Sequence, residues 1–464
     1  MQPRNRQLIG VCLAIAVVLF CLTPQYRNFV LFPSEVRLAE GQLQQLNYRL
    51  PLLAEVKTSQ PDLLRLNGQN LSTGAMQVNL SSPLAMEPLG LGKVTLDFKL
   101  FGFIPFRQMV VDIVPRVKVM VGGHSIGVAL RSDGMIVIGH TVVKGADGHQ
   151  HYPAREAGVN IGDVILAVNG QVVDGIDQAG DMIEHACIGG KPVTLRLRRQ
   201  QEILEITVQP KLDAEARIYR LGIFIRDSAA GVGTLTFYEP NTMTYGALGH
   251  VVTDMDTNQP IDVGEGQVVR ATVTSIEKGR KSSPGEKRGQ DVGEAVGNIE
   301  RNNPYGIFGT LREPLPNQLE PEPIPIALVG QVKEGPAEIL TVVDGDKLER
   351  FQIEIQKLFR QSAPDTKGMV VKITDPRLLE QTGGIVQGMS GSPILQNGRL
   401  VGAVTHVFVN DPTRGYGIFA EWMIRESGIL QKQQAKATML QQRFDPLLSS
   451  YIESRKSIVN CQDL

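Results

Sequence analysis

One short stretch of the chain combines the residue types that nucleophilic catalysis by a serine requires. It reads Gly-Met-Ser-Gly-Ser-Pro over residues 388–393 and leads into an apolar strand. Gly388 allows a tight turn with unusual backbone angles. Such a turn can direct the backbone N–H groups of Gly388 and Ser390 toward one point, which makes an oxyanion hole. Gly391 leaves one side of Ser390 open to substrate, and Pro393 fixes the exit of the turn. We therefore predict Ser390 as a nucleophile, and Gly388 and Ser390 as the oxyanion hole.

This arrangement of glycine, serine and proline is typical of serine proteases of the chymotrypsin type. A hairpin follows, with Asn397-Gly398 at its turn, a dipeptide that strongly favours tight hairpins. The same residues would also suit a purely structural turn between two strands. Ser392 is a rival nucleophile, because Gly391-Ser392-Pro393 could be mistaken for the active segment. A serine is inert without a base, so the interpretation depends on the histidines and acids of the chain.

The chain has seven histidines, five of them within residues 116–210, which carry a different pattern. The other two are His250, at a bend in Leu-Gly-His-Val, and His406, on the strand that leaves the nucleophile hairpin. In chymotrypsin-like proteases the base comes from the first half of the domain and the nucleophile from the second. We therefore predict His250 as the general base, while a structural or substrate-facing role suits His406.

The residues alone leave several candidates for the acid that holds the histidine tautomer and stabilises the imidazolium. Asp375 follows an apolar strand, residues 369–374, in the same half of the domain as Ser390. Asp254 is near His250 in sequence, which by itself does not orient a carboxylate toward the ring. The full set of candidates is Asp254, Asp256, Asp344, Asp346, Asp365, Asp375 and Asp411.

Residues 116–210 resemble a bacterial PDZ domain. The resemblance is closest over residues 153–170, which read PAREAGVNIGDVILAVNG, and a helix is expected at 176–186. A following strand alternates apolar and polar residues over 193–198. Such a domain binds a peptide by strand addition beside a helix, with loop N–H groups meeting a carboxylate. The segment that resembles the carboxylate-binding loop predicts four peptide-binding residues, Ser125, Ile126, Gly127 and Val128.

The N-terminus has the form of an export signal. Arg4 and Arg6 precede an apolar run over residues 8–22, and no small-residue cleavage site follows. The run is 15 residues long, short for a full membrane span. We predict an uncleaved signal anchor, with the rest of the chain outside the cytoplasm. A cleaved signal peptide is the alternative.

Composition restricts the remaining possibilities. The net charge of −1 gives no indication of nucleic acid as a partner. The four cysteines show neither metal-ligand spacing nor a disulfide framework, so no metal and no cofactor is predicted. With 48 glycines and 27 prolines, the chain favours short strands and turns.

Residues 93–100 alternate clearly between apolar and polar residues, which predicts a strand of a β-rich spacer. Residues 278–325 are polar, first basic and then rich in proline, and predict an exposed loop or flap with solvated charges.

The whole layout resembles the family of stage IV sporulation protein B, PDZ-containing serine peptidases of endospore-forming Firmicutes. The N-terminal anchor, the PDZ-like region, Gly249-His250, Thr374-Asp375-Pro376 and residues 388–393 carry the resemblance. It implies a chymotrypsin-like double β-barrel in which Ser390 is the nucleophile, His250 the general base and Asp375 the orienting acid. Two features depart from the chymotrypsin pattern. Asp375 lies shortly before Ser390 rather than near the histidine, and Met389 stands where those proteases have an aspartate.

The resemblance also implies a function. The chain would be a sporulation signalling serine endopeptidase, anchored to the forespore membrane through residues 8–22 and facing the intermembrane space. It would cleave itself and a regulator of the membrane metalloprotease that processes pro-sigma-K, and it would bind other copies of itself through the PDZ-like domain. The alternative is a non-enzymatic PDZ scaffold on a degenerate protease fold. A quality-control protease of the HtrA type is disfavoured, because those enzymes place the PDZ domain after the peptidase domain.

The predicted fold is thus mainly β, with five consecutive parts. They are a signal anchor (1–29), a β-rich spacer domain (30–115), a PDZ-like domain (116–210), a serine peptidase domain (211–430) and a C-terminal tail (431–464).

Overall fold

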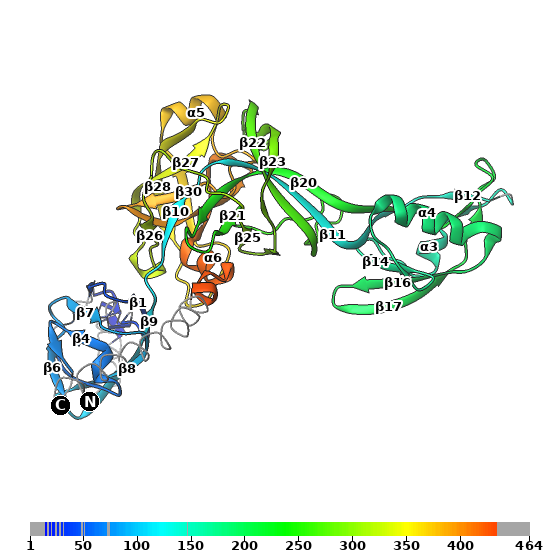
Figure 1. Ribbon diagram of the computed structural model, residues 1–464. Coiled ribbons are helices and arrows are strands. Elements are labelled where there is room, and N and C mark those ends of the chain that lie inside the picture. Colours follow the sequence, from blue (N-terminus) through cyan, green and yellow to red (C-terminus); the bar gives the residue numbers. More distant parts are fainter. Residues whose placement is uncertain are drawn as a thin grey trace, which may run out of the picture. The chain divides into compact units, whose positions relative to one another are not determined.

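The computed structural model forms two compact units (Figure 1). The first comprises Met1–Val117 with Pro325–Val332, and the second comprises Lys118–Ile324 with Lys333–Leu464. The structure describes residues 14–15, 18–19, 21–23, 26, 29–30, 32–47, 50, 52–71, 75–145 and 147–433. Most of the predicted anchor and nearly all of the predicted C-terminal tail therefore lie outside the described residues. None of the helices within the described ranges is long and apolar enough to cross a membrane.

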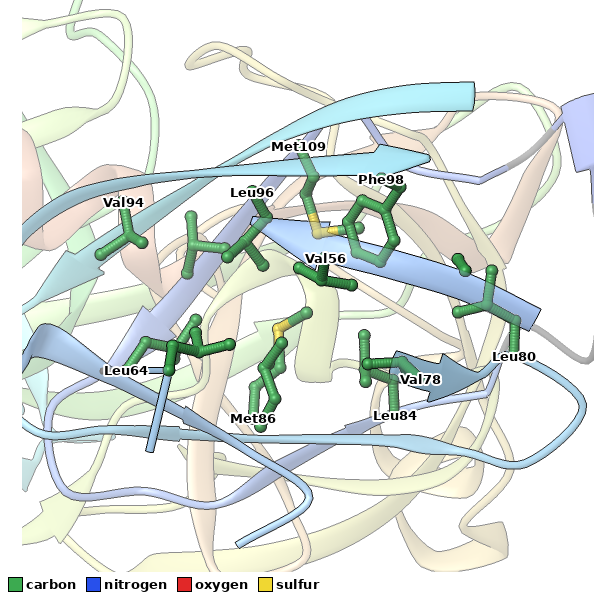
Figure 2. Packing of buried hydrophobic residues seen from close by; sticks show 14 of the residues in the cluster. Val56, Leu64, Val78, Leu80, Leu84, Met86, Val94, Leu96, Phe98 and Met109 are labelled. Carbon is green, nitrogen blue, oxygen red and sulfur yellow. The ribbon is translucent and has the colours of Figure 1, made fainter. Parts of the chain in front are cut away.

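Two β-sheets face each other across the hydrophobic core of the first unit. Their orders are β1-β9-β8-β3-β6 and β2-β7-β4-β5. The strands are β1 (Glu35–Ala39), β2 (Gln44–Leu46), β3 (Leu53–Thr58), β4 (Leu64–Leu66), β5 (Gln69–Asn70), β6 (Met76–Asn79), β7 (Leu84–Pro88), β8 (Gly92–Leu100) and β9 (Ile104–Val114). The alternation at residues 93–100 predicts β8 correctly, since Val94, Leu96 and Phe98 are buried in this core (Figure 2).

In the second unit, the PDZ-like region contains the predicted helix and the alternating strand. The helix is α4 (Ile176–Cys187), and the strand is β16 (Val193–Arg199), whose apolar residues pack with the helix in one buried cluster. The other elements are α3 (Pro153–Glu156), β14 (Val164–Val168) and β17 (Glu202–Val208). The strands pair in the order β17-β16-β14-β11, and β11 (Ser125–His140) continues beyond this region.

Two long strands, β11 and β20 (Ile223–Tyr238), run antiparallel along almost their whole length. Their paired residues extend from Ser125 opposite Thr234 to His140 opposite Ile223. The second half of β11 also pairs with β14, and its first half pairs with β22 (Val263–Glu277). The same two strands therefore belong both to the PDZ-like sheet and to the sheet that precedes the nucleophile.

The nucleophile segment enters a closed six-stranded barrel with the order β27-β28-β29-β32-β31-β30. Its strands are β27 (Gly335–Val342), β28 (Leu348–Leu358), β29 (Met369–Ile373), β30 (Pro393–Gln396), β31 (Arg399–Phe408) and β32 (Asp411–Phe419). The other half is a half-barrel in which β20 continues to β21 (Thr244–Ala247), β25 (Gly306–Thr310) and β24 (Arg301–Asn303). The predicted double barrel is therefore present in part, because only one of its halves closes.

The prediction of a loop or flap at residues 278–325 is wrong, because this segment holds β24, β25 and β23 (Glu286–Asn298), and β23 pairs with β22 over most of its length. The predicted solvated charges are found at Lys278, Arg280, Lys281 and Arg288, which are exposed. The polar composition did not reveal the strands because an antiparallel hairpin can lie largely in water. Lys287 is the clearest exception to the expected solvated charges, since only 1% of it is exposed.

Candidate active site

The turn around Ser390 requires glycine on both sides. Gly388 has φ +89° and Gly391 has φ +94°, values that residues with a side chain rarely adopt. A Cβ atom on Gly391 would also collide with the backbone of Thr234 and Leu248. This close approach places the turn against the segment that leads to His250.

Strand β20 holds the nucleophile turn through two buried threonines. The Thr234 amide donates to the carbonyl of Ser390 at 3.0 Å, and its hydroxyl donates to the carbonyl of Gly388 at 2.8 Å. The hydroxyl of Thr236 donates to the carbonyl of Gly391 at 2.8 Å. Both threonine side chains are fully buried, where a hydrogen bond is costly to lose. The backbone conformation of the turn is therefore set by β20.

Two N–H groups of the turn are available to a ligand. The amides of Met389, Gly391 and Ser392 donate to backbone carbonyls. Those of Gly388 and Ser390 have no acceptor among the described residues. An oxyanion hole consists of such preorganised donors. These two groups can therefore serve the predicted purpose without breaking an existing bond.

His250 has the protonation pattern of a general base. Its Nδ1 lies 2.8 Å from the carbonyl oxygen of Val251. Because a carbonyl only accepts, this bond assigns the proton to Nδ1 and leaves Nε2 with a free lone pair. Burial lowers the pKa of His250 below its usual value, and the bond to Val251 offsets only part of that change. The neutral imidazole is thus favoured at neutral pH.

Ser390 and His250 line the same cleft, which has a volume of about 820 Å³. Their side chains are not hydrogen-bonded to each other, because the hydroxyl of Ser390 donates to the carbonyl of Thr405 at 2.7 Å. Catalytic hydrogen bonds are often incomplete in a free enzyme and form in the substrate complex. Attack by Ser390 would require its hydroxyl to turn from Thr405 to Nε2 of His250.

His406, the second histidine, lies beside the first on β31. The two ring centroids are 4.9 Å apart, and His406 also lines the cleft. Partial burial lowers the pKa of His406, and the neighbouring charges of His250 and Lys367 lower it further. His406 lines the cleft and is partly accessible to solvent, so it can contact a substrate directly.

Asp375 does not line this cleft. Within the described ranges, no hydrogen bond or ion pair joins its carboxylate to His250. It caps α5 (Pro376–Thr382), accepting from the Arg377 amide at 3.0 Å. The Arg377 guanidinium binds the same carboxylate at 2.9 and 3.1 Å, and the Gln352 amide donates to it at 3.3 Å. The bonds to Arg377 hold the pKa of Asp375 below its usual value. In this conformation each carboxylate oxygen of Asp375 therefore already accepts two hydrogen bonds.

Asp254 lines the cleft, but both of its carboxylate oxygens already accept hydrogen bonds. One of its oxygens accepts from the amides of Asp256 and Thr257, at 3.0 and 2.9 Å. The other accepts from Arg226 of β20 at 2.9 Å. Asp254 therefore shapes the loop after His250. Within the described ranges, the group bonded to Nδ1 of His250 is the Val251 carbonyl. These ranges also contain no cluster of His, Cys, Asp and Glu that could hold a metal ion.

The structure corrects the predicted peptide-binding residues. Ser125, Ile126, Gly127 and Val128 lie inside the first half of β11. There β20 pairs with all four, and β22 pairs with the last three from the other side. Strand addition needs a free edge, and a carboxylate needs accessible N–H groups. A strand with neighbours on both sides offers neither.

A better edge for a peptide lies at the start of β20. Residues 223–226 pair with β11 on one side and have no second partner among the described strands, and Ile223 and Ile225 pack against the cluster that contains Ala179 of α4. The sequence signal is Gly-Ile-Phe-Ile at 222–225, in which Gly222 has φ +72° and Phe224 is exposed. The segment at residues 125–128 also has a glycine among apolar residues, so the sequence alone does not distinguish it from residues 222–225.

Two protein-family models match parts of the chain. Residues 217–424 match the SpoIVB peptidase S55 family, and residues 146–199 match the PDZ domain family. Among solved structures, the active form of the Rv3671c protease from M. tuberculosis is 16% identical, with a TM-score of 0.25, covering 43% of this chain and 73% of that one. The inactive form is also 16% identical, with a TM-score of 0.23, covering 42% and 81%. No curated protein sequence matches the chain. The two family matches identify the chain as a SpoIVB-like serine endopeptidase with a PDZ domain.

Proposed function

We propose that Ser390 attacks the scissile carbonyl of a protein substrate, with His250 as the general base. Nε2 of His250 would take the proton of the hydroxyl and then pass it to the leaving amine. The amides of Gly388 and Ser390 would bind the oxyanion, and a water molecule activated by His250 would release the acyl group. The observation that carries this proposal is the shared cleft, in which His250 has Nε2 unprotonated.

The third catalytic role is that of the acid that orients His250. The family resemblance expects Asp375 to orient His250, but here the Val251 carbonyl occupies the Nδ1 position. To orient His250, the Asp375 carboxylate would have to give up its hydrogen bonds with Arg377 and accept one from Nδ1 of His250 instead. The geometry favours a working pair of Ser390 and His250, with Asp375 stabilising the start of α5.

The proposed biological role is a signalling peptidase in sporulation. It would be held at the forespore membrane by the predicted anchor, residues 8–22, and would act in the intermembrane space. It would cleave itself and a protein that regulates the metalloprotease acting on pro-sigma-K. Support for this role comes from the match of residues 217–424 to the SpoIVB peptidase family. The PDZ domain would bind another copy of the chain or the substrate, beside α4.

Labelling with a fluorophosphonate probe tests the chemistry. The full chain in detergent would be compared with Ser390→Ala, Ser392→Ala and His250→Ala. Ser392 is fully buried, so it is not the residue that reacts, and its variant should still be labelled at Ser390, at a lower rate because its bond to Thr341 is lost. Ser390→Ala should lose the label and His250→Ala should label far more slowly. Absence of label from folded wild type, with and without candidate PDZ peptides, would instead favour the non-enzymatic scaffold.

A further inference from the structure

A lysine is buried beneath the nucleophile turn. Lys287, the second residue of β23, is 1% exposed and has no carboxylate partner among the described residues. Burial lowers its pKa to about 7. Lysine is rarely buried without a partner, because removing an ammonium group from water is costly. An apolar residue of the same length would fill this position at a lower cost to stability.

The amine of Lys287 is linked to one end of the turn. Its Nζ donates to the hydroxyl of Thr341, on β27, at 2.8 Å. The same hydroxyl accepts from Ser392 at 3.1 Å. All three side chains are almost completely buried, so water does not compete for these bonds. Through Thr341, Lys287 therefore holds the residue two positions after Ser390.

The stem of Lys287 contacts the other end of the turn. A Cβ atom on Gly388 would lie 3.0 to 3.4 Å from the Cβ, Cγ and Cδ atoms of Lys287, so the stem packs directly against this glycine. The Lys287 amide donates to the carbonyl of Gln387 at 2.9 Å, and the Gln387 amide donates to the carbonyl of Gly285 at 2.8 Å. The segment that enters the turn is thus joined to the start of β23 by an isolated bridge.

We propose that Lys287 is a positioning residue of the oxyanion hole. One side chain fixes both ends of the turn, Gly388 through its stem and Ser392 through its amine and Thr341. Ser390 and the two free amides lie between these ends. The inference rests on the proposed function, because it assigns Lys287 a part in presenting the same nucleophile. It also gives a reason for a buried amine that costs stability.

The experiment measures fluorophosphonate labelling at several probe concentrations, which separates the maximal rate from probe affinity. Lys287→Met keeps the length of the stem and removes the amine. Thr341→Val keeps the shape of the threonine and removes the hydroxyl, whereas Thr341→Ser restores it. We expect the maximal labelling rate to fall about tenfold or more in Lys287→Met and Thr341→Val, since loss of one oxyanion donor typically costs about 10²–10³. Probe affinity should stay unchanged, and Thr341→Ser should label within about threefold of wild type.

Controls separate positioning from folding. Lys281→Met removes an exposed lysine from the segment before β23 and should label like wild type. Thermal unfolding of Lys287→Met should occur at or above the wild-type temperature, because a buried amine without a carboxylate partner is lost. A wild-type labelling rate in Lys287→Met, or a loss explained by a smaller folded fraction, would overturn the inference while leaving the proposed function intact. If wild type does not label at Ser390, the proposed function fails, and this inference fails with it.

Discussion

Replacing Asp375 by asparagine separates two roles that the same residue could have. In the structure, its carboxylate caps α5 and accepts two bonds from the guanidinium of Arg377. Asparagine can still accept from the Arg377 amide, since it is as good an N-cap as aspartate. It loses the charge on the acceptor, and hydrogen bonds to charged groups contribute about 1.5–3 kcal/mol. We therefore expect Asp375→Asn to lower the free energy of unfolding by about 1–3 kcal/mol.

The effect on activity should be small if this geometry is the working one. The Val251 carbonyl holds the tautomer of His250 without Asp375, so the labelling rate of folded Asp375→Asn should stay within about threefold of wild type. An orienting acid behaves differently, because the same change in a Ser-His-Asp triad costs about 10⁴ in rate. Labelling kinetics and urea unfolding should be measured on the same samples. Folded Asp375→Asn that labels about 10³-fold more slowly would refute this reasoning, since it would show that the carboxylate reaches His250.

Two additional measurements make this test sharper. Arg377→Met removes the partner of Asp375 without touching the cleft, so it should destabilise the fold to a similar extent and leave labelling unchanged. The pH dependence has a definite sign. The pKa of Asp375 is lowered in the folded state, so its contribution to stability is present above the unfolded-state pKa and is lost as pH falls through the folded-state pKa. The difference in stability between wild type and Asp375→Asn should therefore shrink in acid.

Three further predictions concern the cleft and its surroundings. Gly391→Ala should prevent stable folding of the peptidase domain or cost more than about 3 kcal/mol in urea unfolding, because φ is +94° and the added methyl meets backbone on two sides. Lys287→Met should abolish part of the rise in stability from pH 7 to 10. Over this pH range the Lys287 amine of wild type is protonated in the unfolded state but largely neutral in the folded state, so the free energy of unfolding rises with pH. A pKa lowered to about 7 corresponds to a rise of at most about 5 kcal/mol. The labelling rate of wild type should fall in acid with a midpoint below the usual histidine pKa, because burial lowers the pKa of His250 and only its neutral form accepts a proton. A midpoint above 7 would contradict that assignment.

The sequence predicts local features of this protein better than pairings between distant segments. The glycines on both sides of Ser390 require positive φ for reasons contained in the hexapeptide itself. Strand β8 follows from its own alternation of apolar and polar residues. The predicted carboxylate-binding residues fail for the opposite reason. Whether Gly127 lies in a loop or inside a sheet depends on its pairing with Val232 and Val269, more than 100 residues away in each case. A local glycine pattern contains no information on such partners.

Charge is a second source of error in reasoning from the sequence. The basic segment that contains Lys287 suits a solvated surface, which is where most lysines lie. Its burial follows from the pairing of β23 with β22 and from the bridge between Glu286 and Gln387, which brings the nucleophile turn over the strand. Likewise, the motif around Asp375 suggests an acid, whereas the helix that begins at Pro376 gives its carboxylate a different set of donors.

The register of β20 explains how the nucleophile and the base reach one cleft although they lie 140 residues apart in the sequence. Arg226, near the start of the strand, binds Asp254 and so holds the loop that follows His250. Thr234, eight residues further along, holds the carbonyls of Gly388 and Ser390. Because side chains alternate along a strand, a slip of one residue would turn both contacts to the opposite face. β20 pairs with β11 over Ile223–Arg226 and again over Ser228–Thr234, with a register shift between the two runs, and this pairing opposes such a slip. The strand edge beside α4 therefore belongs to the same strand that contacts both the nucleophile turn and the loop after His250.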